Sequence, residues 1–450
     1  MTDRRAAAGL VVLMLLAPVP AAAQGSVGPG VARPASVATA VTEFEVNGLK
    51  VLVKRRVSSQ TVVAGLFLRG GVRNITGENA GIESLMLDVA SEASAAYPRT
   101  RMRRELARTG SSLSFGTNRD YSAMTLASPR RSFDAGWAML VDALRHPAFT
   151  ADDFQRVKAR RLDALASMAD TPDAFIGALQ ARTAFAGHPY GSDPDGTPAT
   201  VTAITLDDLK RYHQRMMTTS RLLLVVVGNV DIEDVRRKAQ AAFGDMPRGS
   251  YVESPLPPLQ FTAPTLAVTP RQLPTNYVSG MFAAPAPGSP DYYAMRVATT
   301  ILRDRVFEEV RTRRNLSYAP DAFLSAQAVN TGGLYFTAVD ANQTVRLMLA
   351  EIARLQQEDV AAGLIRSTGQ GFLTTSFLEQ ETNSAQAGVL ALNELIGGGW
   401  QQAERVLDRV RAVTPDDVRR VAGTYMRNLQ FVGLGNPDSF DRQAFTRAAP

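Results

Sequence analysis

Cysteine and histidine, side chains that commonly bind zinc, are scarce in this 450-residue chain. It contains no cysteine, which excludes disulfides, thiol catalysis and zinc sites built on cysteine. Its three histidines, His146, His188 and His213, are scattered, so they form no short metal-binding motif. His188 lies in the loop His188-Pro189-Tyr190-Gly191.

One segment in the second half pairs a guanidinium with a phenol, Arg311 followed seven residues later by Tyr318. A guanidinium can hold a peptide carbonyl or carboxylate with paired donors. A tyrosine hydroxyl can donate to the oxyanion of a tetrahedral intermediate, an interaction worth roughly 3 kcal/mol when preorganised. From the residues alone, a solvated helix position for Arg311 and a half-buried strand position for Tyr318 are the simpler interpretations.

The charge balance favours no nucleic-acid partner. Net charge is +6, which indicates mild attraction to anionic surfaces or acidic peptides. The arginine-rich stretch at residues 99–108 has no interleaved aromatics, so a solvated helix face is the favoured interpretation.

Hydrophobic periodicity predicts alternating strands and helices in each half. We expect one strand at residues 44–54 and another at 61–68, then a helix at 81–95. After a proline-rich stretch the pattern restarts with a strand at 275–282 and a helix at 291–311.

An internal repeat indicates duplication. Residues Thr205–Arg211 read TLDDLKR and Thr414–Arg420 read TPDDVRR, each a helix start with a threonine cap and acidic first turn. Each helix leads to an apolar strand that ends Gly228-Asn229 or Gly435-Asn436. We therefore predict an α+β fold of two equivalent domains, antiparallel-rich sheets with helices packed on them.

The first residues have the pattern of a targeting segment. Arg4 and Arg5 precede an apolar run at residues 6–16, and Ala21–Ala23 offers a small-residue cleavage site. The run is too short for a membrane anchor, and no later stretch reaches the length of a bilayer span. We predict a signal peptide at residues 1–23 and a soluble periplasmic protein after its removal.

The predicted organisation continues with a leader at residues 24–40 and a first domain at 41–247. A linker at 248–264 then joins it to a second domain at 265–443.

The region around residue 84 resembles an insulinase/pitrilysin-type (M16) zinc peptidase, in which a helix carries His-x-x-Glu-His after a strand. The histidines bind zinc and the glutamate activates water. Here Ser84, Leu87 and Asp88 stand at the first-histidine, glutamate and second-histidine positions. The resemblance covers about residues 41–440 and implies a member that has lost its metal centre.

The same resemblance assigns the remaining site positions. The third zinc ligand is expected some 75 residues further on, where Asp163 is the acid near the required register. Asp88 and Asp163 without imidazoles would favour a hard, weakly held cation over zinc. Arg311 and Tyr318 resemble the pair that faces the zinc site from the opposite domain. Residues 330–336 resemble the entry to an edge strand, to which an extended peptide could add, and ordinary sheet structure is an equal alternative for them.

The resemblance therefore implies an exported, zinc-less subunit of a heterodimeric metallopeptidase. This chain would bind no cofactor, and zinc would be held by a catalytic subunit with an intact His-x-x-Glu-His. Arg311 and Tyr318 would bind substrate peptides in trans. The alternative is a peptide-binding or assembly scaffold with no peptidase activity, and an active peptidase using Asp88 and Asp163 is disfavoured because the general base is absent.

Overall fold

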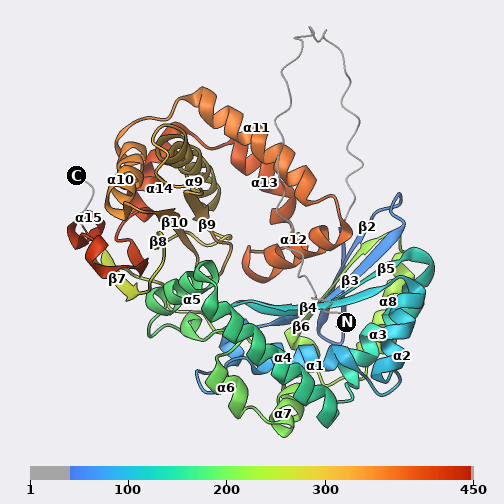
Figure 1. Ribbon diagram of the computed structural model, residues 1–450. Helices are drawn as coiled ribbons and strands as arrows, with labels where there is room; N and C mark the ends of the chain where they lie inside the picture. The colour runs from blue at the N-terminus through green and yellow to red at the C-terminus, as the bar shows by residue number, and fades with distance from the viewer. Residues whose placement is uncertain (1–40, 447–450) are drawn as a thin grey trace, which may run out of the picture. The chain divides into compact units, whose positions relative to one another are not determined.

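The computed structural model describes residues 41–446 (Figure 1). The predicted signal peptide and leader lie outside these residues. Two sheets with helices packed on them confirm the α+β prediction. Residues 244–264 form neither helix nor strand, and the exact domain boundaries stay a prediction.

The first sheet has the strand order β1-β2-β6-β3-β5-β4. Its strands β2 and β6 pair in parallel, and all its other neighbours are antiparallel. The central strand β6 reads LLLVVVG and is buried along its whole length, as expected where both faces of a sheet are covered. The strand bounds are β1 (Val41–Val46), β2 (Leu49–Arg55), β3 (Thr61–Arg69), β4 (Ser112–Thr117), β5 (Tyr121–Pro129) and β6 (Leu222–Gly228).

The second sheet repeats this arrangement without a counterpart of the edge strand β1. Its order is β7-β11-β8-β10-β9, and its one parallel pair joins β7 and β11, which correspond to β2 and β6 of the first sheet. The matching order confirms that the chain contains two equivalent halves. The strand bounds are β7 (Thr265–Pro270), β8 (Asn276–Ala283), β9 (Asp321–Leu324), β10 (Thr331–Ala338) and β11 (Gln430–Gly435).

The repeated sequence forms the same cap in both halves. Thr205 precedes α7 (Leu206–Met216) and accepts the backbone N–H of Asp208 at 3.2 Å. Thr414 precedes α14 (Pro415–Tyr425) and accepts the backbone N–H of Asp417 at 3.2 Å. Both sites are complete capping boxes, in which the aspartate side chain also accepts the threonine N–H.

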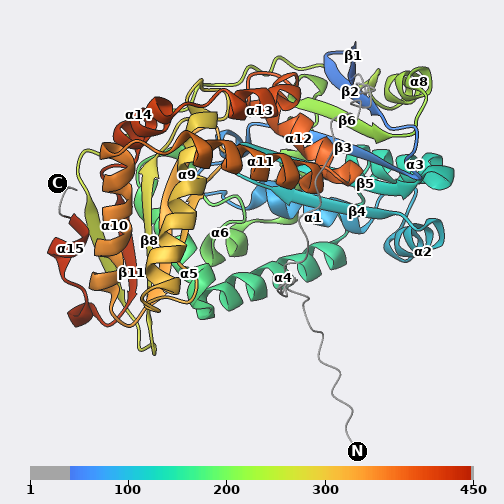
Figure 2. The same ribbon diagram turned by 90° about the horizontal axis from the view of Figure 1, so that it is seen from above.

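Each half sends one helix onto the other half's sheet. Helix α12 (Asn383–Ile396) packs Ala387, Leu390 and their neighbours on the apolar face that includes Phe67 of β3 and Val225 of β6. In the other direction, Ile176 of α5 (Pro172–Ala184) packs against β11. Figures 1 and 2 show α12 beside β3 and α5 beside β8 and β11. The halves are therefore joined by buried apolar contacts.

These and the other helices complete the two halves. Those of the first half are α1 (Ile82–Glu92), α2 (Arg99–Thr109), α3 (Phe133–Arg145), α4 (Ala151–Asp170), α5 (Pro172–Ala184), α6 (Pro198–Ala203), α7 (Leu206–Met216) and α8 (Ile232–Phe243). Those of the second are α9 (Tyr292–Val306), α10 (Ala341–Gln357), α11 (Ala362–Glu379), α12 (Asn383–Ile396), α13 (Gln402–Arg411), α14 (Pro415–Tyr425) and α15 (Arg442–Thr446). None of the helices within residues 41–446 is long and apolar enough to cross a membrane.

Two local predictions are wrong. Residues 44–54 are not one strand: Asn47 (φ 48°) and Gly48 (φ 82°) turn the chain between β1 and β2. An Asn-Gly pair favours this two-residue hairpin turn because both positions need positive φ. The segment at 330–336 is not an edge strand either, since β10 lies between β8 and β9 and the short β9 forms the edge.

Candidate functional site

Helix α1 carries the three positions that match the zinc motif. Gly81 precedes it with φ +93°, and a Cβ there would lie 2.9 Å from the Gly196 Cα and 3.0 Å from the Asp195 carbonyl oxygen. Glycine is therefore required at this turn. Nearly all residues of α1 are buried, so its polar side chains need partners within the protein.

Neither Ser84 nor Leu87 can take the role of the residue that it replaces in the zinc motif. The Ser84 hydroxyl donates to Asp195 Oδ1 at 2.8 Å, which ties α1 to the loop before α6. Leu87 is 2% exposed and belongs to the apolar core of the first half. A hydrocarbon side chain cannot accept a proton from water, so Leu87 cannot act as the general base.

The third motif position, Asp88, is held by arginines of α4. A guanidinium nitrogen of Arg160 lies 2.7 Å from Asp88 Oδ1, and one of Arg161 lies 3.7 Å from Oδ2. The Arg161 guanidinium also forms an ion pair with Asp195, the partner of Ser84. Arg160 and Arg161 therefore place positive charge beside the Asp88 carboxylate.

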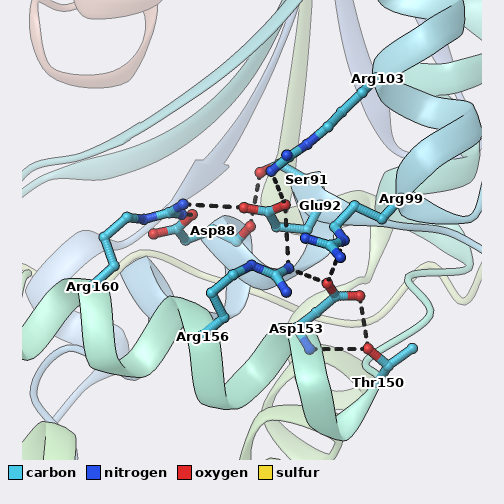
Figure 3. A network of polar contacts seen from close by, with 9 residues as sticks. All are labelled: Asp88, Ser91, Glu92, Arg99, Arg103, Thr150, Asp153, Arg156 and Arg160. Carbon is cyan, nitrogen blue, oxygen red and sulfur yellow. Dashed lines mark hydrogen bonds and ion pairs between the residues drawn. The ribbon is translucent and has the colours of Figure 1, made fainter. Parts of the chain in front are cut away.

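The ion pairs continue one turn along α1 at Glu92 (Figure 3). Its carboxylate is 9% exposed and lies 3.2 Å from Arg160, 3.0 Å from Arg103 of α2 and 3.5 Å from Arg156 of α4. Arg156 in turn pairs with Asp153 at the start of α4. The network joins α1, α2 and α4, which Figure 3 shows converging on the Glu92 carboxylate.

Burial governs the protonation of the motif carboxylate. It raises the pKa of Asp88 above the usual aspartate value, and the charges of Arg160 and Arg161 act against that rise. Asp88 therefore depends on these two arginines to remain ionised in its buried position.

This arrangement does not fit a metal ion. Residues 41–446 contain no group of three His, Cys, Asp or Glu side chains placed to hold one. The carboxylates of Asp88 and Glu92 are already engaged by guanidiniums, which would repel a divalent cation. Asp163 is exposed on α4 and forms no hydrogen bond or ion pair with Asp88.

The structure brings Arg311 and Tyr318 together. Helix α9 ends in a π-helical turn, Phe307–Thr312, that carries Arg311. Its guanidinium lies 4.2 Å from the Tyr318 ring centroid and donates to the Tyr318 carbonyl oxygen. The Tyr318 side chain is 77% exposed, so its hydroxyl is open to a ligand. Phe307, 5.1 Å from the same guanidinium, extends this exposed stack.

The loop around His188 is structural in this fold. The His188 Nδ1 accepts the backbone N–H of Tyr190 at 3.0 Å, which sets the turn. The Tyr190 hydroxyl is buried, donates to Asp120 and accepts the backbone N–H of Val329 at 3.1 Å. Asp120 also accepts the N–H of Ala328 at 3.1 Å. The loop therefore fastens the first half to the second.

Sequence reasoning missed the arginines that complete the site. The resemblance pointed to an acid in α4, Asp163, whereas the side chains of α4 that contact Asp88 are those of Arg160 and Arg161. The available signal was this Arg-Arg pair itself, close to the position of the expected third ligand.

Two family models match the sequence. The model for insulinase (peptidase family M16) covers residues 50–193, and the model for the peptidase M16 inactive domain covers residues 203–367. Together they span more than half of the chain. The chain belongs to the M16 peptidase family. It is a member that has lost the His-x-x-Glu-His of its first half.

Individual proteins and solved structures are similar to this chain over much of its length. An uncharacterised zinc protease of Mycobacterium bovis is 25% identical over 63% of this chain and 67% of its own. The mitochondrial-processing peptidase subunit beta of Lentinula edodes is 21% identical over 87% of this chain and 89% of its own. A crystal structure of a peptidase M16 inactive domain from Pseudomonas fluorescens superposes with a TM-score of 0.81 at 16% identity. It covers 88% of this chain and 98% of that one, which supports the fold.

Proposed function

We propose that this chain is the zinc-less subunit of a two-chain M16 metallopeptidase. A catalytic subunit with an intact His-x-x-Glu-His would hold the zinc, and this chain would complete the peptide chamber. The observation that carries the proposal is the contrast between its two sites. The Asp88 carboxylate is already paired with arginines, whereas Arg311 and Tyr318 contact each other and the Tyr318 side chain is exposed. The name of one relative, a processing-peptidase subunit, supports assembly with a second chain.

Each residue of the open pair has a role that its chemistry allows. Arg311 would hold a substrate carbonyl or carboxylate through the guanidinium donors that now bond the Tyr318 carbonyl. The Tyr318 hydroxyl would donate to the oxyanion that forms when the partner's zinc-activated water attacks the peptide carbonyl. Neither role needs a metal in this chain.

Export to the periplasm belongs to the same proposal. It is supported by the charged start, apolar run and small-residue site within residues 1–23. Amino-terminal sequencing of the protein recovered from a periplasmic extract tests it, and a chain that keeps residues 1–23 in the cytoplasm contradicts it.

The experiment mixes the purified mature chain with an M16 chain from the same source that carries His-x-x-Glu-His. Cleavage of a quenched peptide library is measured for the mixture and for each chain alone. Arg311→Ala and Tyr318→Phe are the test variants. Arg313→Ala is the matched control, since Arg313 is exposed on the adjoining turn and forms ion pairs with Glu308 and Glu309.

We expect cleavage in the mixture alone, a loss of at least tenfold in kcat/KM for both test variants, and no change for the control. Cleavage by the isolated chain that a chelator abolishes would contradict the proposal. A stable complex without any gain in activity would favour the alternative, a peptide-binding or assembly scaffold.

A further inference from the structure

Arg296 of α9 presents an unpaired guanidinium to a large cavity. Within residues 41–446 it forms no hydrogen bond and no ion pair, although its side chain is half-buried. Its nitrogens are not enclosed by protein, so a ligand can reach them. The ring centroid of Phe372 on α11 lies 4.9 Å from the guanidinium carbon. A guanidinium stacked on an aromatic ring keeps the donors in its own plane available.

Two phenols lie next to this guanidinium in the sequence and line the same cavity. Tyr292 and Tyr293 are 8% and 6% exposed, and their ring centroids lie 5.5 Å apart. In the part of the chain that the structure describes, neither hydroxyl has a hydrogen-bond partner, and neither is enclosed by protein. We refer to Arg296, Tyr292 and Tyr293 as the Arg296 cluster. It offers several unpaired donors that a bound anion could accept.

The charges that act on the two phenols are positive. Burial raises the pKa of Tyr292 and of Tyr293, and the charge of Arg296 acts against that rise in both. The charge of Arg409 on α13 also acts against the rise at Tyr293. The surroundings of the cluster therefore favour a negatively charged group.

The cavity has a volume of about 940 Å³, at the upper end of the range for ligand sites. It lies between α9, α11, α12 and the edge strand β9, and Figure 2 shows α11 beside α9. Its wall on α9 runs from Tyr292 to Asp304, about 18 Å at 1.5 Å per residue. Apolar side chains of the other elements, such as Phe323 and Leu392, complete it. An elongated cavity of this kind suits an extended peptide segment.

The acidic side chains of the cavity belong to other parts of its wall. Asp304 lies about two turns further along α9, 3.9 Å from Arg303. Burial raises the pKa of Asp321 on β9, and the charge of Arg303 acts against that rise. Glu379 is the last residue of α11. None of these three carboxylates forms an ion pair with the Arg296 cluster, which is thus the positive end of the cavity.

The opposite end of the cavity is close in sequence to the Arg311–Tyr318 pair. Asp304 is seven residues before Arg311, and Asp321 is three residues after Tyr318. Along α9 and its π-helical turn, Arg296 and Arg311 are 15 residues apart, which corresponds to about 20 Å. An extended peptide spans that distance with about six residues.

We propose that this cavity holds the segment of a substrate peptide that extends from the Arg311–Tyr318 pair, and that the Arg296 cluster binds a carboxylate of that segment. The carboxylate lies about six residues from the peptide bond that Arg311 holds, and it belongs to an acidic side chain or to the peptide terminus. Arg296 would supply paired donors to it, and the two hydroxyls would supply further ones. This inference rests on the proposed function and adds a preference for acidic peptides to it.

The test measures peptide binding to the purified full chain by isothermal titration calorimetry. The first peptide is N-acetyl-Glu-Ala-Leu-Ala-Thr-Ala-Leu-Phe-Ala-amide, and the second has glutamine in place of glutamate. The third is the glutamine peptide with a free terminal carboxylate. We expect at least one of the two carboxylate peptides to bind tenfold or more tightly than the uncharged glutamine amide. Which of them does so identifies the source of the carboxylate.

Variants separate the Arg296 cluster from the Arg311–Tyr318 pair. Arg296→Met keeps an unbranched stem against Phe372 and should abolish the preference for a carboxylate, while binding of the glutamine amide is retained. Tyr293→Phe should reduce the preference several-fold. Arg311→Ala should weaken all three peptides equally and so leave the preference intact. Arg366→Met, at an exposed position of α11 outside the cavity lining, should bind as the unaltered chain does.

Three outcomes would overturn the inference: no binding of any peptide, equal binding of all three, or a preference that survives Arg296→Met. Inorganic phosphate that binds as tightly as the preferred peptide would contradict peptide recognition. Thermal unfolding shows whether each variant folds, and if Arg296→Met does not, the peptide comparison and Tyr293→Phe decide the question. Because this chain is titrated alone, a failure here is distinct from a failure of the two-chain mixture to cleave peptides.

Discussion

Replacing Arg160 tests whether guanidinium charge stabilises the former zinc site. In Arg160→Met the hydrocarbon stem is largely kept, and Asp88 loses its 2.7 Å partner. Asp88→Asn removes the carboxylate charge with little change of shape. The two single variants and the double variant form a cycle that isolates the interaction between these side chains.

The expected coupling energy follows from the exposure of the two side chains. Removing one partner of a fully buried pair costs about 3–5 kcal/mol, whereas exposed pairs contribute about 0–1 kcal/mol. The Asp88 side chain is 7% exposed and that of Arg160 is 53% exposed, and Arg161 remains 3.7 Å away in the variant. We therefore expect a coupling of about 1.5 kcal/mol, between the two limits.

Urea unfolding measures this coupling through the fluorescence of Trp137, which lies in the first-half core. A Trp400→Phe background removes the only other tryptophan. The control cycle uses Arg211 and Asp208, an exposed pair on α7 for which we expect at most about 0.5 kcal/mol. A coupling for the Arg160 cycle no larger than that of the control would refute the stabilising role of the arginines.

Three further results are expected. Burial raises the pKa of Glu83, so its contribution to stability is present below about pH 4.5 and falls as pH rises through the folded-state pKa. Above this pH the free energy of unfolding of Glu83→Gln should therefore rise relative to that of the unaltered chain. Curves of unfolding free energy against pH that stay parallel for the two proteins would contradict this. Tyr190→Phe should lose about 1–3 kcal/mol in urea unfolding because the buried Asp120 loses a donor; an unchanged midpoint would count against the interdomain role of the loop. Restoring His-x-x-Glu-His in α1 should give no stoichiometric zinc by elemental analysis while Arg160 and Arg161 remain, and one zinc per chain would contradict that.

The sequence predicted the duplicated fold well because duplication leaves a local signal. The threonine caps at Thr205 and Thr414 and their acidic first turns recur as the same capping boxes. The helix exchange between halves had no such signal, because the contacts of Ile176 and Ala387 join segments distant in sequence. The Asn47-Gly48 pair is a local signal for the hairpin, and the single strand predicted at residues 44–54 did not take it into account.

For the site, the sequence identified positions but not their interactions. Ser84, Leu87 and Asp88 showed that the metal motif was absent, and Arg311 and Tyr318 proved to be in contact. The partners of the motif positions could not be found from spacing alone. Arg160 contacts Asp88, which lies 72 positions away in the sequence, through the packing of α4 on α1.

The most direct test of the central claim is a titration of the candidate catalytic subunit with this chain, followed by the rate of peptide cleavage. The account predicts no cleavage by either chain alone and a rate that rises until the two are equimolar. It also predicts that Arg311→Ala forms the same complex without the activity. A catalytic subunit that is fully active alone, and unchanged by this chain, would contradict the account.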